Sequence, residues 1–430
     1  MIRAVLSVFL ASVFVASAAP PPGGAARTGD YPNLFKTYLG KTDAEVEARL
    51  DTAFQLMFYG DPFTQKIYYT IADDMAYLAD VGSRDIRSEG ISYGMMITVQ
   101  LDKQSEFNKL WKFAKTYMYH DEGPLRGYFT WHRAYDGGMT RSDGSVIRGD
   151  GPAPDGEEWM VMALMFASNR WGDGEGIFDY NREAQDLLRM MIHKDDQPDR
   201  GSVVSMFHPE EKQIRFTPDG YGASFTDPSY HVPHFYELMA RWAEDPADRA
   251  FMAEVAKTSR EFFRKAAHPE TGIMPNYSHF DGTQLERRGR DFEADAWRTL
   301  GWPAMDWSWW GQDEWMVEQS NRILRFLASQ PADNWPDKLQ LDGTVVRTNP
   351  IAPGMTGMAA VAALAAEPDL GKPFVERLWN MALPSDVGRN TDGLIVEGEL
   401  RSWRYYEGLL SMFGLLKVSG HFRVYGEVTD

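Results

Sequence analysis

The chain has 430 residues, of which 43% are hydrophobic and 13% aromatic, enough apolar material for a large core, and this composition excludes an intrinsically disordered protein. Its formal net charge of −18 disfavours binding to nucleic acid or anionic membranes, both of which attract basic surfaces. The chain contains no cysteine, so disulfides, thiolate catalysis and a cysteine-linked lipid anchor are excluded.

The first thirty residues are expected to lie outside the folded domain. Residues 1–19 combine Arg3, a short apolar run and the small residues Ala16-Ser17-Ala18, which predicts a signal peptide and a secreted or periplasmic protein. Residues 20–30, rich in proline and glycine, are predicted to form a disordered spacer. Because no later low-complexity segment divides the chain, residues 31–430 are predicted to form a single domain.

Beyond the spacer, apolar residues recur mostly at helical spacing and predict about twelve helices. The expected helices cover residues 42–59, 89–102, 105–119, 156–171, 179–193, 229–243, 247–266, 291–300, 311–329, 354–366, 371–382 and 402–417. Two short β-hairpins are predicted in the loops, one from Ser202–Phe207 and Gln213–Thr217 and one from His279–Leu285. This pattern predicts an all-α fold, an (α/α)6 barrel of helical hairpins, and disfavours a doubly wound sheet.

The segment from Ser88 to Gly94 begins the second of these helices and places Glu89 in its first turn. Residues 90–94 also match the Gly-x-Ser-x-Gly pattern of serine hydrolases, which requires a buried strand leading into the serine. The preceding residues 82–89 are too charged for such a strand. The sequence therefore favours Ser92 as a helix-face or substrate-contacting residue and not as a nucleophile.

Metal binding is not predicted. The pair His231 and His234 lacks the glutamate and the spacing of a zinc-binding helix, so hydrogen-bonded histidines of the core or of a groove are expected. Residues 173–179 resemble a calcium loop only loosely and lack its order of ligands.

Three carboxylates, Glu89, Asp155 and Asp295, each adjoin a glycine-rich turn or an aromatic residue, and none belongs to a charged run. In so acidic a chain, most acidic residues are expected to lie on the surface and to be solvated. A structural alternative for Asp155 is to cap the N-terminus of the helix that follows it. Hydrolysis of a glycosidic bond needs one protonated and one ionised carboxyl group. The helix dipole favours the anion of Glu89, whereas burial against Tyr93 and a bound sugar favours its acid form.

Fourteen tryptophans point to a sugar substrate, because flat aromatic rings pack against the C–H faces of sugars. Trp131, Trp159, Trp302 and the cluster 307–310 are expected near the loops that carry the carboxylates. A single tryptophan is more often a core residue, and it is the clustering that favours a sugar-binding surface.

The order of these motifs resembles glycoside hydrolase family 8 from about residue 31 to the last helix. The matching stretches are Ser88–Met95, Gly127–Trp131, Pro152–Glu158, Asp227–Tyr230 and Asp295–Arg298. The resemblance implies an (α/α)6 barrel that hydrolyses β-1,4 glycosidic bonds with inversion and without a metal or another cofactor. It also implies that the domain is catalytic, with Glu89 as general acid and Asp295 as general base.

The other site residues are implied by the same resemblance. Asp155 is similar to the acid that hydrogen-bonds the distorted sugar at the cleavage point. Tyr230 resembles the tyrosine beside the base, and Trp131 resembles the stacking platform. Arg298 is expected to orient Asp295.

Within the family, Met95-Met96 and residues 154–158 and 231–237 look most like reducing-end xylose-releasing exo-oligoxylanases. This implies a xylo-oligosaccharide or xylan substrate, and we expect a monomer that binds no nucleic acid or membrane. Those enzymes block the groove with a loop histidine, expected here near residues 349–354, but this chain has no histidine between His279 and His421. An endo-β-1,4-xylanase is therefore the first alternative, followed by an endoglucanase or chitosanase and by a glycan-binding protein without turnover.

Overall fold

A computed structural model describes residues 19–349, 352–384 and 403–429 of the chain. The predicted signal peptide, except for Ala19, lies outside the described residues, and so do residues 350 and 351 of the expected blocking loop. Among the described residues, no helix has the length and apolarity needed to cross a membrane.

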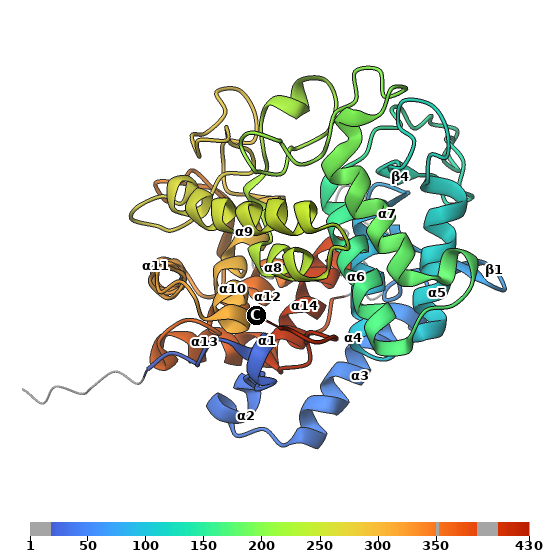
Figure 1. Cartoon of the computed structure of the whole chain (residues 1–430). Coiled ribbons are helices and arrows are strands. Elements are labelled where there is room, and N and C mark those ends of the chain that lie inside the picture. The colour runs from blue at the N-terminus through green and yellow to red at the C-terminus, as the bar shows by residue number, and fades with distance from the viewer. Residues whose placement is uncertain (1–18, 350–351, 385–402, 430) are drawn as a thin grey trace, which may run out of the picture.

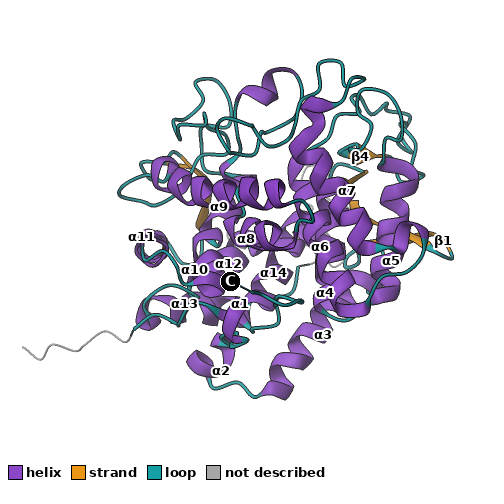
Figure 2. Cartoon of the chain, in the orientation of Figure 1, coloured by secondary structure: helices purple, strands orange, loops and turns teal. Residues whose placement is uncertain are grey.

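Helices dominate the fold, and most of them form an inner and an outer ring (Figure 1, Figure 2). The inner helices are α4 (Ser88–Gln100), α6 (Pro154–Trp171), α8 (Pro233–Trp242), α10 (Trp302–Trp310), α12 (Pro353–Ala362) and α14 (Gly408–Val418). The outer helices are α3 (Asp43–Tyr59), α5 (Gln104–Phe113), α7 (Tyr180–His193), α9 (Pro246–Ala266), α11 (Trp315–Ala328) and α13 (Pro368–Asn380). Each outer helix contacts the inner helix that precedes it in the chain, and α3 contacts α14, so the predicted (α/α)6 barrel is confirmed.

The inner and outer helices differ in how much of their surface is buried. Every residue of α12 and α14 is buried, whereas outer helices such as α5 and α7 bury one face and expose the other. Gly357 and Gly414 lie where α12 and α14 meet, and a Cβ on Gly414 would come within 2.6 Å of the Gly357 backbone. Glycine at this position therefore allows two inner helices to pack at very short distance.

The predicted helices are confirmed with shifted ends and one change of helix type, and three α-helices of the described chain were not predicted: α1 (Ala25–Thr28), α2 (Leu34–Leu39) and α10. The segment expected at 291–300 is a 3-10 helix, Ala294–Leu300, and α10 was not predicted because Pro303 and several tryptophans interrupt the expected pattern. Pro303 lies in the first turn of α10, where a missing backbone N–H costs no helical hydrogen bond.

Strands occur outside the rings. An antiparallel sheet contains β1 (Tyr68–Ala72), β2 (Met75–Asp80), β3 (Asp85–Arg87) and β4 (His132–Arg133) in that order, and β5 (Trp335–Leu339) pairs with β6 (Val345–Asn349). These strands were not predicted. The two predicted hairpins are present as turns with single bridges, Phe207 to Ile214 and Ser278 to Gln284. Because β3 ends where α4 begins, the sheet sets the position of the first turn of α4.

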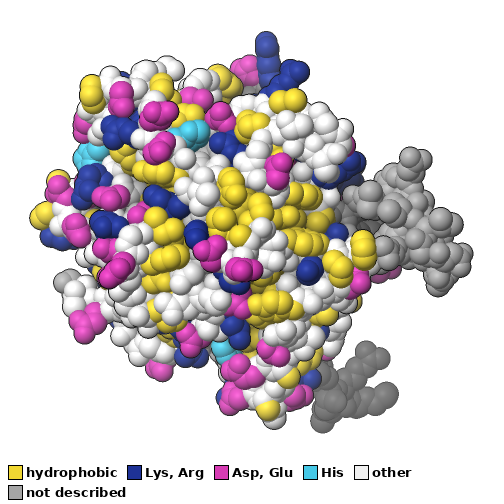
Figure 3. All heavy atoms as spheres, turned by 90° about the vertical axis from the view of Figure 1, so that its right-hand side faces the viewer, with side chains coloured by type: hydrophobic (Ala, Val, Ile, Leu, Met, Phe, Trp, Pro, Cys, Tyr) yellow, Lys and Arg dark blue, Asp and Glu magenta, His cyan; other side chains and the backbone are white. Residues whose placement is uncertain are grey.

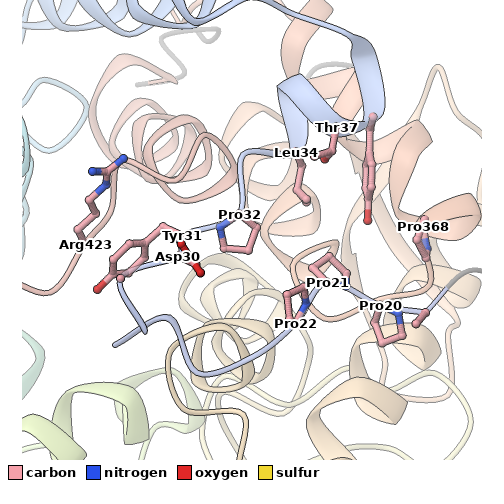
Figure 4. A pocket seen from close by; sticks show the side chains of 13 residues that line it. Pro20, Pro21, Pro22, Asp30, Tyr31, Pro32, Leu34, Thr37, Pro368 and Arg423 are labelled. Carbon is pink, nitrogen blue, oxygen red and sulfur yellow. The ribbon is translucent and has the colours of Figure 1, made fainter. Parts of the chain in front are cut away.

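The prediction of a disordered spacer at residues 20–30 was wrong, because this segment is ordered against the barrel (Figure 4). Residues Ala25–Thr28 form the short helix α1, which contacts α10. The Trp307 indole donates a hydrogen bond to the Pro21 carbonyl at 2.9 Å, and the Gly24 N–H donates to the Ser308 carbonyl at 3.1 Å. The prolines that suggested a flexible spacer line a surface cavity of about 510 Å³ together with Tyr31.

Lys417 on α14 is buried in the core without a polar partner. Its side-chain nitrogen lies 4.1 to 5.5 Å from the centroids of four aromatic rings and makes no hydrogen bond with the described residues. The rings are those of Trp159, Trp302, Phe413 and Phe422. Burial lowers the pKa of Lys417 well below its usual range, since the charged form is poorly solvated there.

We expect Lys417→Met to raise the melting temperature at pH 7 by roughly 2 °C or more. At that pH the unfolded chain protonates this lysine, whereas the folded chain disfavours its charge, so the wild type loses stability as the pH falls below the ordinary lysine pKa. The gain should therefore shrink as the pH approaches about 10. Thermal unfolding of this variant and of the exposed control Lys372→Met measures the difference, and an equal shift in both variants would contradict the argument.

Candidate active site

The residues predicted to form the site meet at one end of the barrel, where the inner helices begin. Glu89 lies in the first turn of α4 and Asp155 in the first turn of α6. Tyr230 lies three residues before α8, and Asp295 and Arg298 lie in the 3-10 helix that leads into α10. Polar side chains at or just before the starts of several inner helices therefore meet at one centre.

A cleft of about 350 Å³ lies over this centre. Five of the six predicted residues line it: Glu89, Trp131, Asp155, Tyr230 and Asp295. The sixth, Arg298, lies behind them with only 1% of its side chain exposed. The cleft is also lined by residues that were not predicted: Arg87, Ser88, Pro152, Ala153, Phe216, Thr217 and Tyr277.

The Arg298 guanidinium connects the three carboxyl groups. Its Nη1 lies 2.9 Å from Asp155 Oδ2 and 3.5 Å from Glu89 Oε2, and its Nη2 lies 3.5 Å from Asp295 Oδ1. Nη1 also donates to the Tyr93 hydroxyl at 2.7 Å. One positive charge therefore faces three acids, so at least one of them gains from holding a proton.

Glu89 is the acid best placed to hold that proton. Its side chain is 14% exposed, whereas that of Asp295 is 29% exposed. Asp155 is only 6% exposed, but it lies closer to the Arg298 guanidinium, at 2.9 Å, which favours its anion. Burial raises the pKa of Glu89 to about 8; Arg298 opposes this shift, while Asp155 and Asp295 reinforce it. The pKa of Asp155 is raised as well, chiefly by burial and against the effect of Arg298. A protonated Glu89 beside a more exposed Asp295 matches the pair of carboxyl states that glycoside hydrolysis requires.

These pKa shifts predict a pH profile. If Glu89 must be protonated, kcat/KM should fall as the pH rises through about 8, because the acid form is then lost. The Asp155 charge raises the pKa of Glu89, so Asp155→Asn should move this alkaline limb to lower pH. The measurement is kcat/KM against pH for both proteins, and a limb that stays in place or moves to higher pH would contradict the coupling.

Glycine follows Glu89 and Asp155 in their motifs because a side chain at either position would clash. A Cβ on Gly90 would lie 2.6 Å from the Tyr405 hydroxyl, and that hydroxyl donates to Glu89 Oε1 at 3.3 Å. A Cβ on Gly156 would lie 2.5 Å from the Ser88 hydroxyl. Glycine therefore admits the tyrosine beside Glu89 and lets the starts of α4 and α6 approach each other.

The backbone around Asp295 is held from both sides. Ala294 adopts a left-handed conformation with φ of 42°, which is uncommon for a residue with a side chain. Its carbonyl accepts a hydrogen bond from the Tyr406 hydroxyl at 3.1 Å, and the N–H of Ala296 donates to Asn276 Oδ1 at 2.9 Å. Such conformations persist where neighbouring contacts determine them, and here they set the direction of Asp295.

Trp131 lies across the cleft wall beside Arg87. Its carbonyl accepts a hydrogen bond from the Ser88 N–H at 2.9 Å, and the Arg87 guanidinium lies 5.5 Å from the centroid of its ring. Arg87 is held in turn by ion pairs with Asp80 at 3.1 Å and Asp85 at 3.2 Å. The β2–β3 sheet thus fixes an aromatic face and a cation close to Glu89.

Tyr230 is fixed by its own motif. Asp227 Oδ1 accepts hydrogen bonds from the Ser229 N–H at 2.7 Å and hydroxyl at 2.6 Å, which shapes the turn that carries the tyrosine. The Tyr236 hydroxyl, which also contacts the buried Glu158, lies 3.0 Å from the Tyr230 carbonyl. The Tyr230 ring stacks against Phe216, so the two rings form a continuous aromatic wall of the cleft.

The structure corrects the prediction that several tryptophans form a sugar surface. The side chains of Trp159, Trp302, Trp309 and Trp310 are buried in the core, with at most 2% exposed. Trp131 is the tryptophan that lines the cleft in the described part of the chain. Sequence alone could not separate these cases because both kinds of tryptophan adjoin glycine, proline and acidic residues.

Three further alternatives are also decided. Ser92 is buried in the second turn of α4 and its hydroxyl donates to the Glu89 carbonyl at 2.9 Å, so it is no nucleophile, even though the short strand β3 does precede the helix. Asp155 is not an N-cap, because α6 begins at Pro154 and its cap residue is Ala153.

His231 is a core residue that is hydrogen-bonded to the hydroxyls of Thr226 and Ser259, and His234 is fully buried. No group of three metal-binding side chains is found among the described residues.

Comparison with known proteins identifies the family and agrees with the fold. Residues 78–418 match the family model of glycosyl hydrolases family 8. The chain is 42% identical to the reducing-end xylose-releasing exo-oligoxylanase Rex8A of Paenibacillus barcinonensis over 94% of this chain and 98% of that protein. The structure of Rex8A in complex with xylose superposes with a TM-score of 0.83 at 40% identity, covering 94% of this chain and all of that one.

A second solved structure is similar to the same degree. A xylanase from Teredinibacter turnerae, a catalytic mutant in complex with xylohexaose, has a TM-score of 0.82 at 41% identity over 94% of this chain and all of that one. The family match extends over most of the barrel and includes every carboxylate of the cleft. The chain therefore belongs to glycosyl hydrolases family 8.

Proposed function

We propose that this protein hydrolyses β-1,4-xylosidic bonds in xylo-oligosaccharides or xylan with inversion and releases xylose from the reducing end. The single observation that carries the chemistry is the pair Glu89 and Asp295, held by one arginine but in different surroundings. The substrate is inferred from relatives described as reducing-end xylose-releasing exo-oligoxylanases, which are 33 to 42% identical to this chain.

In the proposed reaction, protonated Glu89 gives its proton to the glycosidic oxygen as the bond to the anomeric carbon breaks. Asp295, the more exposed carboxylate, takes a proton from a water that attacks the opposite face of the sugar. The product therefore has the inverted configuration. Proton NMR of the first product anomer tests this step, and an anomer of retained configuration would rule it out.

The other residues are proposed to position substrate and acids. Asp155 accepts a hydrogen bond from a sugar hydroxyl, Tyr230 lies beside the base, and Trp131 supplies a flat face for a sugar ring. Arg298 holds the carboxyl groups in place, and its charge favours their ionised forms.

The second candidate function is an endo-β-1,4-xylanase. It is favoured by the absence of a histidine between His279 and His421 and by the comparable similarity to the Teredinibacter turnerae xylanase. Incubation with xylohexaose decides between the two. Release of xylose and xylopentaose as first products supports exo action, and xylohexaose labelled with ¹⁸O at its reducing end assigns it to that end if the label appears in xylose. Xylobiose, xylotriose and xylotetraose as first products support internal cleavage.

Two further properties are proposed on the sequence. Secretion or periplasmic export is proposed because residues 1–19 resemble a signal peptide, and it is tested by N-terminal sequencing of the exported protein. A monomeric state is tested by light scattering of the purified protein.

A further inference from the structure

A loop with three arginines lies beside the cleft. Residues 287–290 read Arg-Arg-Gly-Arg, and none of these three arginine side chains forms an ion pair or hydrogen bond with the rest of the described chain. On the face shown in Figure 3, by contrast, acidic and basic side chains are interspersed. In a chain of net charge −18, such a group of unneutralised cations indicates a negatively charged ligand.

The backbone holds this loop against the cleft wall. The Tyr277 N–H donates to the Gly289 carbonyl at 2.8 Å, and the Gln284 side chain donates to the Arg290 carbonyl at 2.7 Å. Gly289 has a φ of 61°, and a Cβ there would lie 2.1 Å from the Tyr277 ring. Because Tyr277 lines the cleft, the position of the loop relative to the substrate is determined by the fold.

Arg288 is the arginine of this loop that contacts the aromatic wall. Its guanidinium carbon lies 5.6 Å from the ring centroid of Phe216, 5.5 Å from that of Tyr277 and 5.0 Å from that of Phe225. It lies 5.7 Å from the ring of Tyr221, which is 66% exposed. The rings fix the guanidinium without neutralising it, so its N–H donors remain available to an acceptor.

We propose that Arg288 binds a carboxylate on the substrate, so that the cleft favours xylo-oligosaccharides that carry a uronic acid branch over neutral ones. This inference rests on the proposed xylan-type substrate. The charge of Asp295 repels a carboxylate at the centre of the cleft, whereas the exposed loop accommodates one on a branch that points outwards. An arginine fork suits the planar carboxylate of a uronic acid.

The test compares one branched xylo-oligosaccharide with its uronic acid methyl ester, which has nearly the same shape but no charge. We expect the wild type to show a kcat/KM about ten-fold higher for the acid, as one charge-assisted contact at a partly exposed site provides. Arg288→Gln should abolish this preference, and Arg288→Lys, which keeps the charge but not the fork, should retain part of it. High salt should weaken the preference.

Arg290→Gln is the matched control, since it removes the same charge from the same loop without a ring contact, and it should preserve the preference. Equal rates for acid and ester in the wild type would overturn the proposal, and so would an equal loss in the Arg288 and Arg290 variants, which would indicate only the general charge of the loop. Linear xylohexaose separates the two hypotheses: if it is not cleaved, the proposed function fails, whereas normal cleavage without an acid preference refutes only the role of Arg288.

Discussion

Replacement of Glu89 by glutamine is expected to lower kcat/KM for xylo-oligosaccharides by roughly 10²–10⁴-fold, because the amide occupies the same space but has no acidic proton to give the leaving oxygen. The fold should be unaffected, since Glu89 lies at the cleft and its contacts with Arg298 and Tyr405 are at 3.5 and 3.3 Å. Glu175→Gln, at an exposed position, serves as the control and should keep full activity.

The role of Glu89 as an acid is tested by changing the leaving group. In a β-xylobiosyl fluoride, the fluoride ion leaves without being protonated. Glu89→Gln should therefore hydrolyse this substrate far better than it hydrolyses xylohexaose. Full activity of the variant on xylohexaose would exclude Glu89 as the acid. Equal loss on both substrates would assign Glu89 to binding and not to proton transfer.

Replacement of Asp295 by asparagine is expected to cause a loss of similar size, roughly 10²–10⁴-fold, on both substrates. The attacking water must lose a proton whichever group leaves, and an amide cannot take it. Azide, a nucleophile that needs no base, should restore turnover of the fluoride and give a glycosyl azide of inverted configuration. This contrast with Glu89→Gln distinguishes a base from an acid.

Asp291→Asn is the control for Asp295, because Asp291 precedes it by four residues and pairs with Lys338 at 3.4 Å instead of with Arg298. It should keep nearly normal activity. If Asp295→Asn keeps the activity of this control, another group activates the water. Asp227 is then the next candidate, because it is a buried acid whose pKa is raised by burial and by Asp295.

Much of the ring of helices was predictable because helix formation depends on neighbours three and four residues apart, and the apolar pattern records this spacing. The tryptophans show the limit of such local information. Trp131 and Trp302 both occur beside glycine or proline, yet one lines the cleft and the other is completely buried. Which of them meets the substrate depends on packing between helices distant in sequence.

The cleft residues also fall into two groups, those that local sequence identifies and those that only the tertiary structure brings to the site. Glu89, Asp155 and Asp295 were identifiable because each lies in a short motif, and Glu89 and Asp155 are followed by a glycine that close packing requires. Tyr277, Phe216 and Tyr405 were not, because they reach the site from loops and a helix start whose sequences carry no comparable signal. The ordered segment 20–30 was also missed, since its prolines are held by Trp307 and Ser308, nearly three hundred residues away.

The sequence by itself determined the helical architecture, the absence of cysteine chemistry, and the residue types available for acid–base catalysis, because these follow from composition and from local spacing. The tertiary structure decided how deeply each carboxyl group is buried and which charges surround it. Glu89 is buried, shares one guanidinium with Asp155 and Asp295 and has a raised pKa, whereas Asp295 is more exposed. The reason is that desolvation and charge interactions depend on distances between residues 66 to 206 positions apart, which only the folded chain brings together.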